Sequence, residues 1–249
     1  MIEKLKKAKE YFHFLERIAK IDFKDGEWVT LEGVHSYTFD NLNGSGCLVP
    51  QGDNTLVFFK GSDDMMDFVM DAMMFMGKYY VEGVVVVVVG KAHAGFLASW
   101  AILRREAFKA VERLDPHKEK VYTVVGHSLG AAMALMMADD LKTMGYMVEE
   151  VYTAGSPRVG DSRFVAWLKS RLRIVRIVNN YDLVPVLITG WFGWYKHVGT
   201  SVFLRDLYSV DSGAYRWNPL GYFRSGIKDH LISSYVSSLK GILKNREAF

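Results

Sequence analysis

The segment VYTVVGHSLGAAMALMMADDLK, residues 121–142, constrains the fold more than any other part of this 249-residue chain. It starts with β-branched and aromatic residues typical of a buried strand, and it ends with small and apolar residues typical of a buried helix. The two glycines between them leave room for a sharp turn. We therefore predict a strand at Val121 to Val125 that leads directly into a helix.

Short apolar runs recur along the chain and alternate with helical patterns in its later part. The runs are TLVFFK, VVVVVV, VYTVV, EEVYTA and LRIVRIV. This alternation predicts an α/β fold in which helices flank a central, mostly parallel sheet. The valine run at residues 84–89 is too short to span a bilayer and is predicted to be a buried strand.

No internal repeat or low-complexity linker interrupts the chain, so residues 1–249 are predicted to form a single domain. Within residues 1–20, apolar side chains recur at helical spacing and most lysines lie elsewhere. This pattern predicts an N-terminal amphipathic helix that docks on the domain, with attachment to a membrane surface as the alternative. The apolar positions are Leu5, Ala8, Phe12, Leu15 and Ala19.

Charge and cysteine content narrow the partners and the compartment. The net charge is only +3, and the lysines and arginines are spread along the chain, so we expect no nucleic-acid partner. The single cysteine, Cys47, excludes an internal disulfide, and the N-terminal residues MIEKLKKAKE lack the apolar stretch of a secretory signal. We therefore expect a cytoplasmic protein without a transmembrane segment, unless a leader has been removed; the oligomeric state stays open.

Residues Gly126 to Gly130 match the pattern G-x-S-x-G between the predicted strand and helix. Such a turn holds its serine in a strained conformation and exposes the hydroxyl, and side chains at the two glycines would collide. Ser128 is therefore our candidate nucleophile. The alternative is a glycine-rich turn that only starts a helix.

A serine nucleophile needs an imidazole base and a carboxylate that orients the base. On α/β-hydrolase sheets these residues follow in the order Ser, Asp or Glu, His. His230, at the junction between the glycine-containing loop YFRSGIKD and the helical pattern HLISSYVSSL, is favoured over His197, which we expect to be structural. Asp182, just past the run LRIVRIV, is favoured as the acid over Asp161.

Acyl transfer also needs backbone N–H groups that bind the developing oxyanion. Leu129, directly after the candidate nucleophile, is expected to supply one donor. The second is expected from Gly61 or Ser62, which follow the predicted strand in LVFFKGSDD.

Several segments in order resemble the class 3 lipases, the fungal triacylglycerol lipase-like family of α/β-hydrolases. They are FFKGSDDMMDFVMD, KAHAGFLASW, VVGHSLGAAMA, AGSPRVGD, RIVNNYDLVPVL, KHVGTSVFL and HLISSYVSSL. The resemblance implies an α/β-hydrolase fold with Ser128 as nucleophile, Asp182 as acid and His230 as base. It also implies Ser62 and Leu129 as oxyanion donors, and no metal or organic cofactor. Lys60 and Phe68 depart from the usual arginine and tryptophan of the family.

Two further segments suggest an apolar substrate. Residues 62–77 predict an amphipathic helix with an acidic stripe and a methionine-rich face, which fits a lid over the active site; a fixed core helix is the alternative. Aromatic residues after the acid loop fit a lipid-facing rim, or else internal packing. The residues expected at this lid and acyl groove are Met66, Met70, Met73, Trp191 and Trp194.

The leading functional hypothesis is a serine carboxylester hydrolase that acts on acylglycerols or similar lipid esters. Its partners would be the ester substrate and, transiently, a lipid surface. Phospholipase A1, a soluble-ester esterase and a thioesterase stay open on the same fold. A catalytically silent binding protein with this fold is the more distant alternative.

Overall fold

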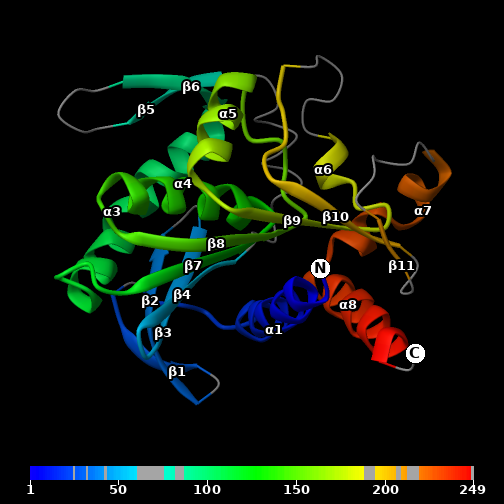
Figure 1. Cartoon of the computed structure of the whole chain (residues 1–249), viewed down its shortest axis with the longest axis horizontal. Coiled ribbons are helices and arrows are strands. Elements are labelled where there is room, and N and C mark those ends of the chain that lie inside the picture. Colours follow the sequence, from blue (N-terminus) through cyan, green and yellow to red (C-terminus); the bar gives the residue numbers. More distant parts are fainter. Residues whose placement is uncertain are drawn as a thin grey trace.

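A computed structural model describes most of the chain as one layered body (Figure 1). The described residues are 1–24, 26–31, 33–41, 44–60, 76–81, 87–187, 194–205, 209–211 and 219–247. No helix in these ranges combines the length and the apolar character that are needed to cross a membrane.

A nine-stranded sheet crosses the described part of the molecule in the order β1-β2-β3-β4-β7-β8-β9-β10-β11. Its strands are β1 Trp28–Leu31, β2 Val34–Asn41, β3 Gly44–Gln51, β4 Asn54–Phe59, β7 Val121–His127, β8 Met147–Ala154, β9 Ile174–Asn179, β10 Thr200–Arg205 and β11 Ser209–Asp211. The strands from β4 to β10 are parallel, whereas β1 to β4 and the pair β10–β11 are antiparallel. The predicted α/β fold with a largely parallel centre is confirmed.

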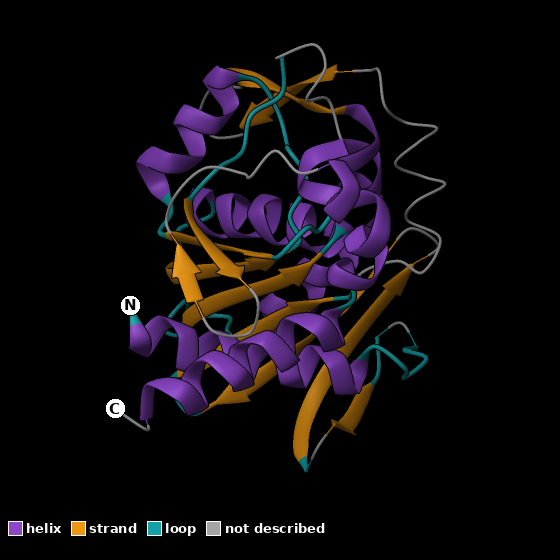
Figure 2. Cartoon of the chain, turned by 90° about the vertical axis from the view of Figure 1, so that its right-hand side faces the viewer, coloured by secondary structure: helices purple, strands orange, loops and turns teal. Residues whose placement is uncertain are grey.

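Helices cover both faces of this sheet (Figure 2). They are α1 Ile2–Ile18, α3 Ala94–Leu114, α4 Leu129–Thr143, α5 Ser162–Arg171, α6 Val184–Leu187, α7 Pro219–His230 and α8 Ile232–Glu247. Neighbouring strand residues point to opposite cores, since Val151 packs with α3 and α4 while Tyr152 packs with α1 and α8. Both faces of the parallel strands are therefore buried, which explains their nearly continuous apolar runs.

The N-terminal helix α1 is docked on the domain. Its apolar face is buried against the sheet and against α8, which lies beside it near both termini (Figure 2). Ile18, rather than the predicted Ala19, completes the buried stripe. Lys4 and Lys7 on its polar side lie near Glu150 and Glu149 after the start of β8.

A two-stranded ribbon, β5 Met76–Val81 and β6 Val87–His93, stands apart from the main sheet. Val87 and Val88 are 50% and 37% exposed, so the prediction of a buried strand is wrong for this part of the valine run. Successive strand residues point to opposite faces, so this end of the two-stranded ribbon is exposed on both faces. Met76 and Gly77 lie in β5, so the predicted helix 62–77 does not include its last two residues; residues 62–75 lie outside the described ranges.

A buried carboxylate ties this ribbon and α5 to the core. Asp139 of α4 is fully buried and accepts hydrogen bonds from Tyr79 Oη at 3.2 Å, Trp167 Nε1 at 2.9 Å and Arg171 Nε at 2.8 Å. Because a charge without water must be bonded by protein groups, the three donors and the acid depend on one another.

Asp139→Ala should therefore lower the free energy of unfolding by about 1–3 kcal/mol, since it leaves the donors of Tyr79 and Trp167 and the partly exposed guanidinium of Arg171 without their shared acceptor. Glu149→Ala is the control, because Glu149 pairs with Lys7 at 3.9 Å on the surface and should cost less than about 1 kcal/mol. Urea denaturation of both variants measures the difference. Equal losses would show that the Asp139 cluster adds nothing beyond a surface pair.

Candidate active site

The turn between β7 and α4 holds Ser128 in the left-handed region, with φ 62° and ψ −126°. Few residues other than glycine adopt this strained conformation. A Cβ atom at Gly126 would collide with the backbone of Gly130, and one at Gly130 would collide with the carbonyl groups of Phe59 and Lys60. The flanking glycines are therefore required by close backbone contacts on both sides of the serine.

Ser128, His230 and Asp182 form a continuous hydrogen-bonded chain. The Ser128 hydroxyl lies 2.5 Å from His230 Nε2, and His230 Nδ1 lies 2.9 Å from both carboxylate oxygens of Asp182. An Nδ1–H that donates to the carboxylate leaves Nε2 as the acceptor of the serine proton. The arrangement is able to transfer a proton from Ser128 to His230.

The carboxylate of Asp182 is fully buried and bonded on both oxygens. Besides the imidazole, Oδ1 accepts the backbone N–H of Val184 at 2.9 Å, and Oδ2 accepts the hydroxyl of Tyr235 at 2.5 Å. A buried carboxylate needs such donors in place of water. Tyr235, in the first turns of α8, is therefore part of the site, and the sequence patterns did not indicate it.

His230 stands at the break between α7 and α8, where two backbone carbonyls leave the helical pattern. The Asp229 carbonyl accepts from Asn179 Nδ2 at 3.0 Å, and the His230 carbonyl accepts from His127 Nε2 at 2.8 Å. The prediction that a loop carries His230 is wrong, since residues 219–230 are helical. Asp182 bonds the imidazole, while His127 of β7 and Asn179 of β9 bond the backbone carbonyls of His230 and Asp229.

His127 is half-buried beside the catalytic candidates. Burial, together with the nearby His230 side chain, lowers the pKa of His127 to about 3. A neutral imidazole carries one N–H, and the contact with the His230 carbonyl places that proton on Nε2. His127 is therefore a neutral donor. Its bond to the His230 carbonyl helps to fix the position of His230, the partner of Ser128.

The two competing candidates lie elsewhere. His197 Nε2 contacts the Pro185 carbonyl at 2.9 Å, and burial with nearby Arg176 and Arg158 keeps the pKa of His197 well below its usual value. Asp161 caps α5 by accepting the Phe164 N–H at 2.8 Å. Neither side chain is bonded to Ser128 or His230 in the described structure.

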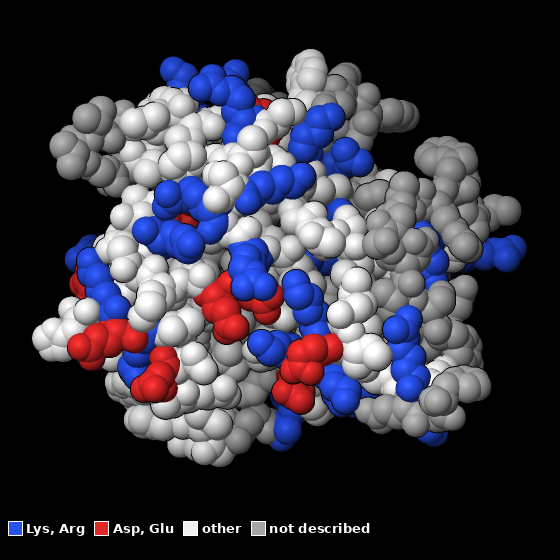
Figure 3. Space-filling model, viewed as in Figure 1, with Lys and Arg blue, Asp and Glu red and all other residues white. Residues whose placement is uncertain are grey.

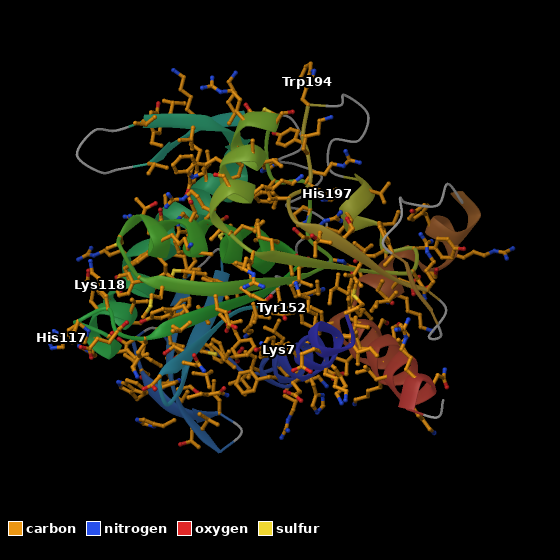
Figure 4. The ribbon with its side chains drawn as sticks, in the orientation of Figure 1. Lys7, His117, Lys118, Tyr152, Trp194 and His197 are labelled. Carbon is orange, nitrogen blue, oxygen red and sulfur yellow. The ribbon has the colours of Figure 1, made fainter. Side chains whose placement is uncertain are left out.

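The remaining predicted site residues are only partly placed. Leu129 is the first residue of α4, directly after Ser128. Trp194 is 66% exposed at the surface, above His197 in Figure 4. The others lie outside the described residues: Ser62, Met66, Met70, Met73 and Trp191. Ser128 itself is only 1% exposed.

Comparison with known proteins assigns the family. Residues 56–190, more than half of the chain, match the family described as lipase (class 3). The matched stretch contains both Ser128 and Asp182. The chain belongs to the class 3 lipases.

This class 3 lipase matches its curated relatives over part of their length. The lipase of Rhizomucor miehei is 31% identical over 176 residues, which cover 65% of this chain and 46% of that protein. The secreted mono- and diacylglycerol lipase A of Penicillium cyclopium is 36% identical over 99 residues, which cover 39% of this chain and 32% of that protein. The chain thus spans less than half the length of each relative.

A solved structure extends the similarity to nearly the whole fold. Lipase II from Rhizopus niveus aligns with a TM-score of 0.74 at 22% identity, over 93% of this chain and 94% of that one. The α/β-hydrolase fold that the sequence resemblance implies is thereby confirmed.

These comparisons correct the expected cytoplasmic location. The Penicillium relative is named as a secreted enzyme, and the same word stands in the name of a relative from Malassezia globosa. The inference failed because one cysteine excludes only an internal disulfide, and a protein without disulfides is not thereby an intracellular one.

Lys60 replaces the arginine that is usual in this family, and it still anchors the end of β4. Its ammonium donates to the Ile21 carbonyl at 2.6 Å and lies 4.5 Å from the centre of the Phe23 ring. Both partners belong to the segment that links α1 to β1. The lysine thus fastens the strand end beside the Ser128 turn to the N-terminal part of the chain.

His230→Ala should lower kcat on a soluble ester by about 10⁴-fold or more, because the serine proton then has no acceptor. His197→Ala is the matched control, and it should change the free energy of unfolding more than kcat. Steady-state kinetics and urea denaturation of both variants separate the two effects. The reverse pattern would reassign the base to His197.

The pH dependence of stability tests the state of His127. Its pKa is about 3 in the folded protein and about 6.5 when unfolded, so unfolding takes up a proton between these values. Its contribution to stability is complete above pH 6.5 and falls by about 1.4 kcal/mol per pH unit below it.

His127→Asn should therefore make the decline of the unfolding free energy between about pH 6 and pH 4 shallower. Replacement of the exposed His117 by Asn is the control (Figure 4). Denaturant titrations at several pH values measure the slopes. Identical slopes for both variants would mean that His127 is not buried as a neutral group.

Proposed function

We propose that the protein is a serine carboxylester hydrolase, a lipase that cleaves acylglycerols or related lipid esters through an acyl-enzyme intermediate. The observation that carries this proposal is the hydrogen-bonded chain from Ser128 through His230 to Asp182 in the strained turn of a class 3 lipase family member. The lipid-ester substrate rests on the names of the relatives, which are lipases and a mono- and diacylglycerol lipase.

In the first half of the reaction, His230 Nε2 takes the proton of Ser128 while the oxygen attacks the ester carbonyl. Asp182 stabilises the imidazolium that forms, and the Leu129 N–H and Ser62 bind the oxyanion. His230 then gives its proton to the leaving alcohol, which leaves the acyl group on Ser128. Water, activated by the same imidazole, releases the carboxylic acid and restores the serine.

Tyr235, Asn179 and His127 act as positioning residues in this scheme. They bond the acid and the two carbonyls around His230, and they do not touch the reacting atoms. Their role is to keep Nε2 within reach of the serine while the imidazole changes its charge twice per turnover. Loss of such a contact raises the barrier through misplacement.

The name of the Penicillium relative supports action outside the cell. Extracellular acylglycerols occur as emulsions or membranes, and a lipase reaches them at a lipid surface. The predicted lid stays a prediction for residues 62–75, since Met76 and Gly77 lie in β5, and the near-complete burial of Ser128 is the feature that a movable cover would explain.

A fluorophosphonate probe tests the nucleophile. The wild-type protein should be labelled at Ser128, and Ser128→Ala should not be labelled, because the probe captures only an activated serine. Asp182→Asn should retain the fold and lose about 10⁴ in kcat on a soluble ester. Labelling of the Ser128→Ala variant at the wild-type level would contradict the assignment.

A panel of esters tests the substrate class. Acylglycerols and phospholipids of several chain lengths are assayed below and above their solubility limits, next to short soluble esters and thioesters. A rate that rises when the acylglycerol forms an emulsion supports a lipase. Activity confined to soluble esters, or to phospholipids, would replace the proposed substrate class by that one.

A further inference from the structure

One end of the molecule carries exposed cations around an exposed indole. The face consists of Lys78, Tyr80, Lys91, Arg163, Trp194 and Lys196, and we call it the Trp194 face. It includes the outer side of the β5–β6 ribbon, the first turn of α5 and the segment before β10. All six side chains are exposed, Trp194 to 66% and Tyr80 to 51%.

Backbone bonds join β6, the residues before α5 and the Lys196 segment within this face. Lys91 and Lys196 flank Gly160, since the Lys91 carbonyl accepts the Asp161 N–H at 2.8 Å and the Lys196 N–H donates to the Gly160 carbonyl at 2.7 Å. The face also holds an open hollow of about 500 Å³, lined by Lys91, Arg163 and Trp194 together with Met76, Asp161 and Ser162. The indole therefore stands beside the cations over a shallow depression.

The cations of this face have no ion-pair partner among the described residues. In the described ranges, Lys78, Lys91, Arg163 and Lys196 form no ion pair with an acidic side chain. Asp161, whose carboxylate accepts the Phe164 N–H at 2.8 Å and caps α5, also lines the hollow, so one carboxylate lies among its cations. Figure 3 shows Lys and Arg gathered over the ribbon and α5, with most of the visible Asp and Glu in the opposite half.

The ribbon even places two lysines directly opposite each other. Lys78 pairs with Lys91 across the antiparallel strands β5 and β6. Like charges at such positions destabilise a ribbon. An anionic surface against the ribbon offsets this repulsion between the two lysines.

From these observations we propose that the Trp194 face docks on an anionic lipid surface. The proposal rests on the proposed lipase function, which gives the protein a reason to bind lipid at all. The chemistry of the occupant follows from the side chains: phosphate or carboxylate groups pair with the cations, and Trp194 and Tyr80 insert at the boundary between head groups and acyl chains. Each basic residue near such a surface contributes about a fivefold gain in partitioning.

The products of the proposed reaction strengthen this binding. Hydrolysis of an ester releases a carboxylic acid, which is ionised near neutral pH and stays in the lipid when its chain is long. Each turnover thus adds negative charge to the surface that the enzyme works on. Adsorption increases as the reaction proceeds, until the product is removed.

Vesicle binding tests the proposal, with the protein's own affinity and not its activity as the readout. The wild type should bind vesicles of phosphatidylcholine with phosphatidylglycerol much more tightly than vesicles of phosphatidylcholine alone, and added salt should weaken the difference. The triple variant Lys91→Gln, Arg163→Gln, Lys196→Gln should lose about 100-fold in partitioning to the anionic vesicles. Trp194→Ala should weaken binding to both kinds of vesicle.

A second triple variant serves as the control. Lys240→Gln, Lys244→Gln and Arg246→Gln remove the same charge from the exposed side of α8, which lies at the opposite side of the molecule (Figure 1). This variant should bind anionic vesicles like the wild type, because only the placement of the charges differs. Neither triple variant should change kcat on a soluble ester.

Three results would overturn the docking proposal. One is equal binding of the wild type to neutral and anionic vesicles, and another is an equal loss in both triple variants. The third is a dimer of the free protein that the first triple variant abolishes, since this would assign the face to a second copy of the chain. Failure of the proposed function is distinct: the fluorophosphonate probe would then leave Ser128 unlabelled whatever the vesicles show.

Discussion

The buried carboxylate of Asp182 is the interaction on which the C-terminal third of the molecule depends. It lies away from water, so protein groups must supply its hydrogen bonds. The donors come from three places: Val184 at the start of α6, His230 at the end of α7 and Tyr235 in α8. A single charge thereby fixes the acid loop and the two last helices relative to one another.

The sheet also fixes the backbone around His230. His127 and Asn179, at the ends of β7 and β9, bond the two carbonyls on either side of the break between α7 and α8. The Ser238 hydroxyl in turn donates to Oδ1 of the Asn179 amide at 2.7 Å. Gly155, with φ 57°, leaves the space that the acid and the imidazole occupy, since a Cβ atom there would lie 2.8 Å from Asp182 Oδ2. His230 is thus bonded through its ring and through its backbone carbonyl, and its ring packs against Gly155.

The parts of this site that could be predicted have a local signal. The glycines around Ser128 mark a tight turn, and the apolar runs before Ser128 and Asp182 mark strands that end at the same edge of the sheet. His127, Asn179 and Tyr235 could not be predicted in this way, because ordinary polar residues in a strand or helix carry no local mark of a partner. Their bonds join positions 50 to 103 residues apart in the chain, as in the pairs Asn179–Asp229 and His127–His230.

Glycine misled the prediction of α7 for a physical reason. The segment YFRSGIKD contains glycine and serine, which favour turns, yet it is helical. A Cβ atom at Gly226 would collide with the Leu183 side chain, and one at Gly221 would lie 2.8 Å from the Tyr181 ring. These glycines permit close contact between α7 and the acid loop, and only the packed structure distinguishes that use from a turn.

Chemistry and docking occupy different parts of the molecule, and this separation has a kinetic consequence. Ser128 is enclosed, whereas the cations of the Trp194 face project from the ribbon and α5 and have no bonds to the catalytic candidates. Binding energy gained at the face is the same in the ground state and in the transition state, so it raises the amount of adsorbed enzyme and leaves the chemical step unchanged. With a net charge of only +3, the chain achieves this by placement of its cations and not by their sum. Adsorption and turnover are therefore separable properties of this fold, one set by the surface of the ribbon and the other by the hydrogen bonds around Asp182.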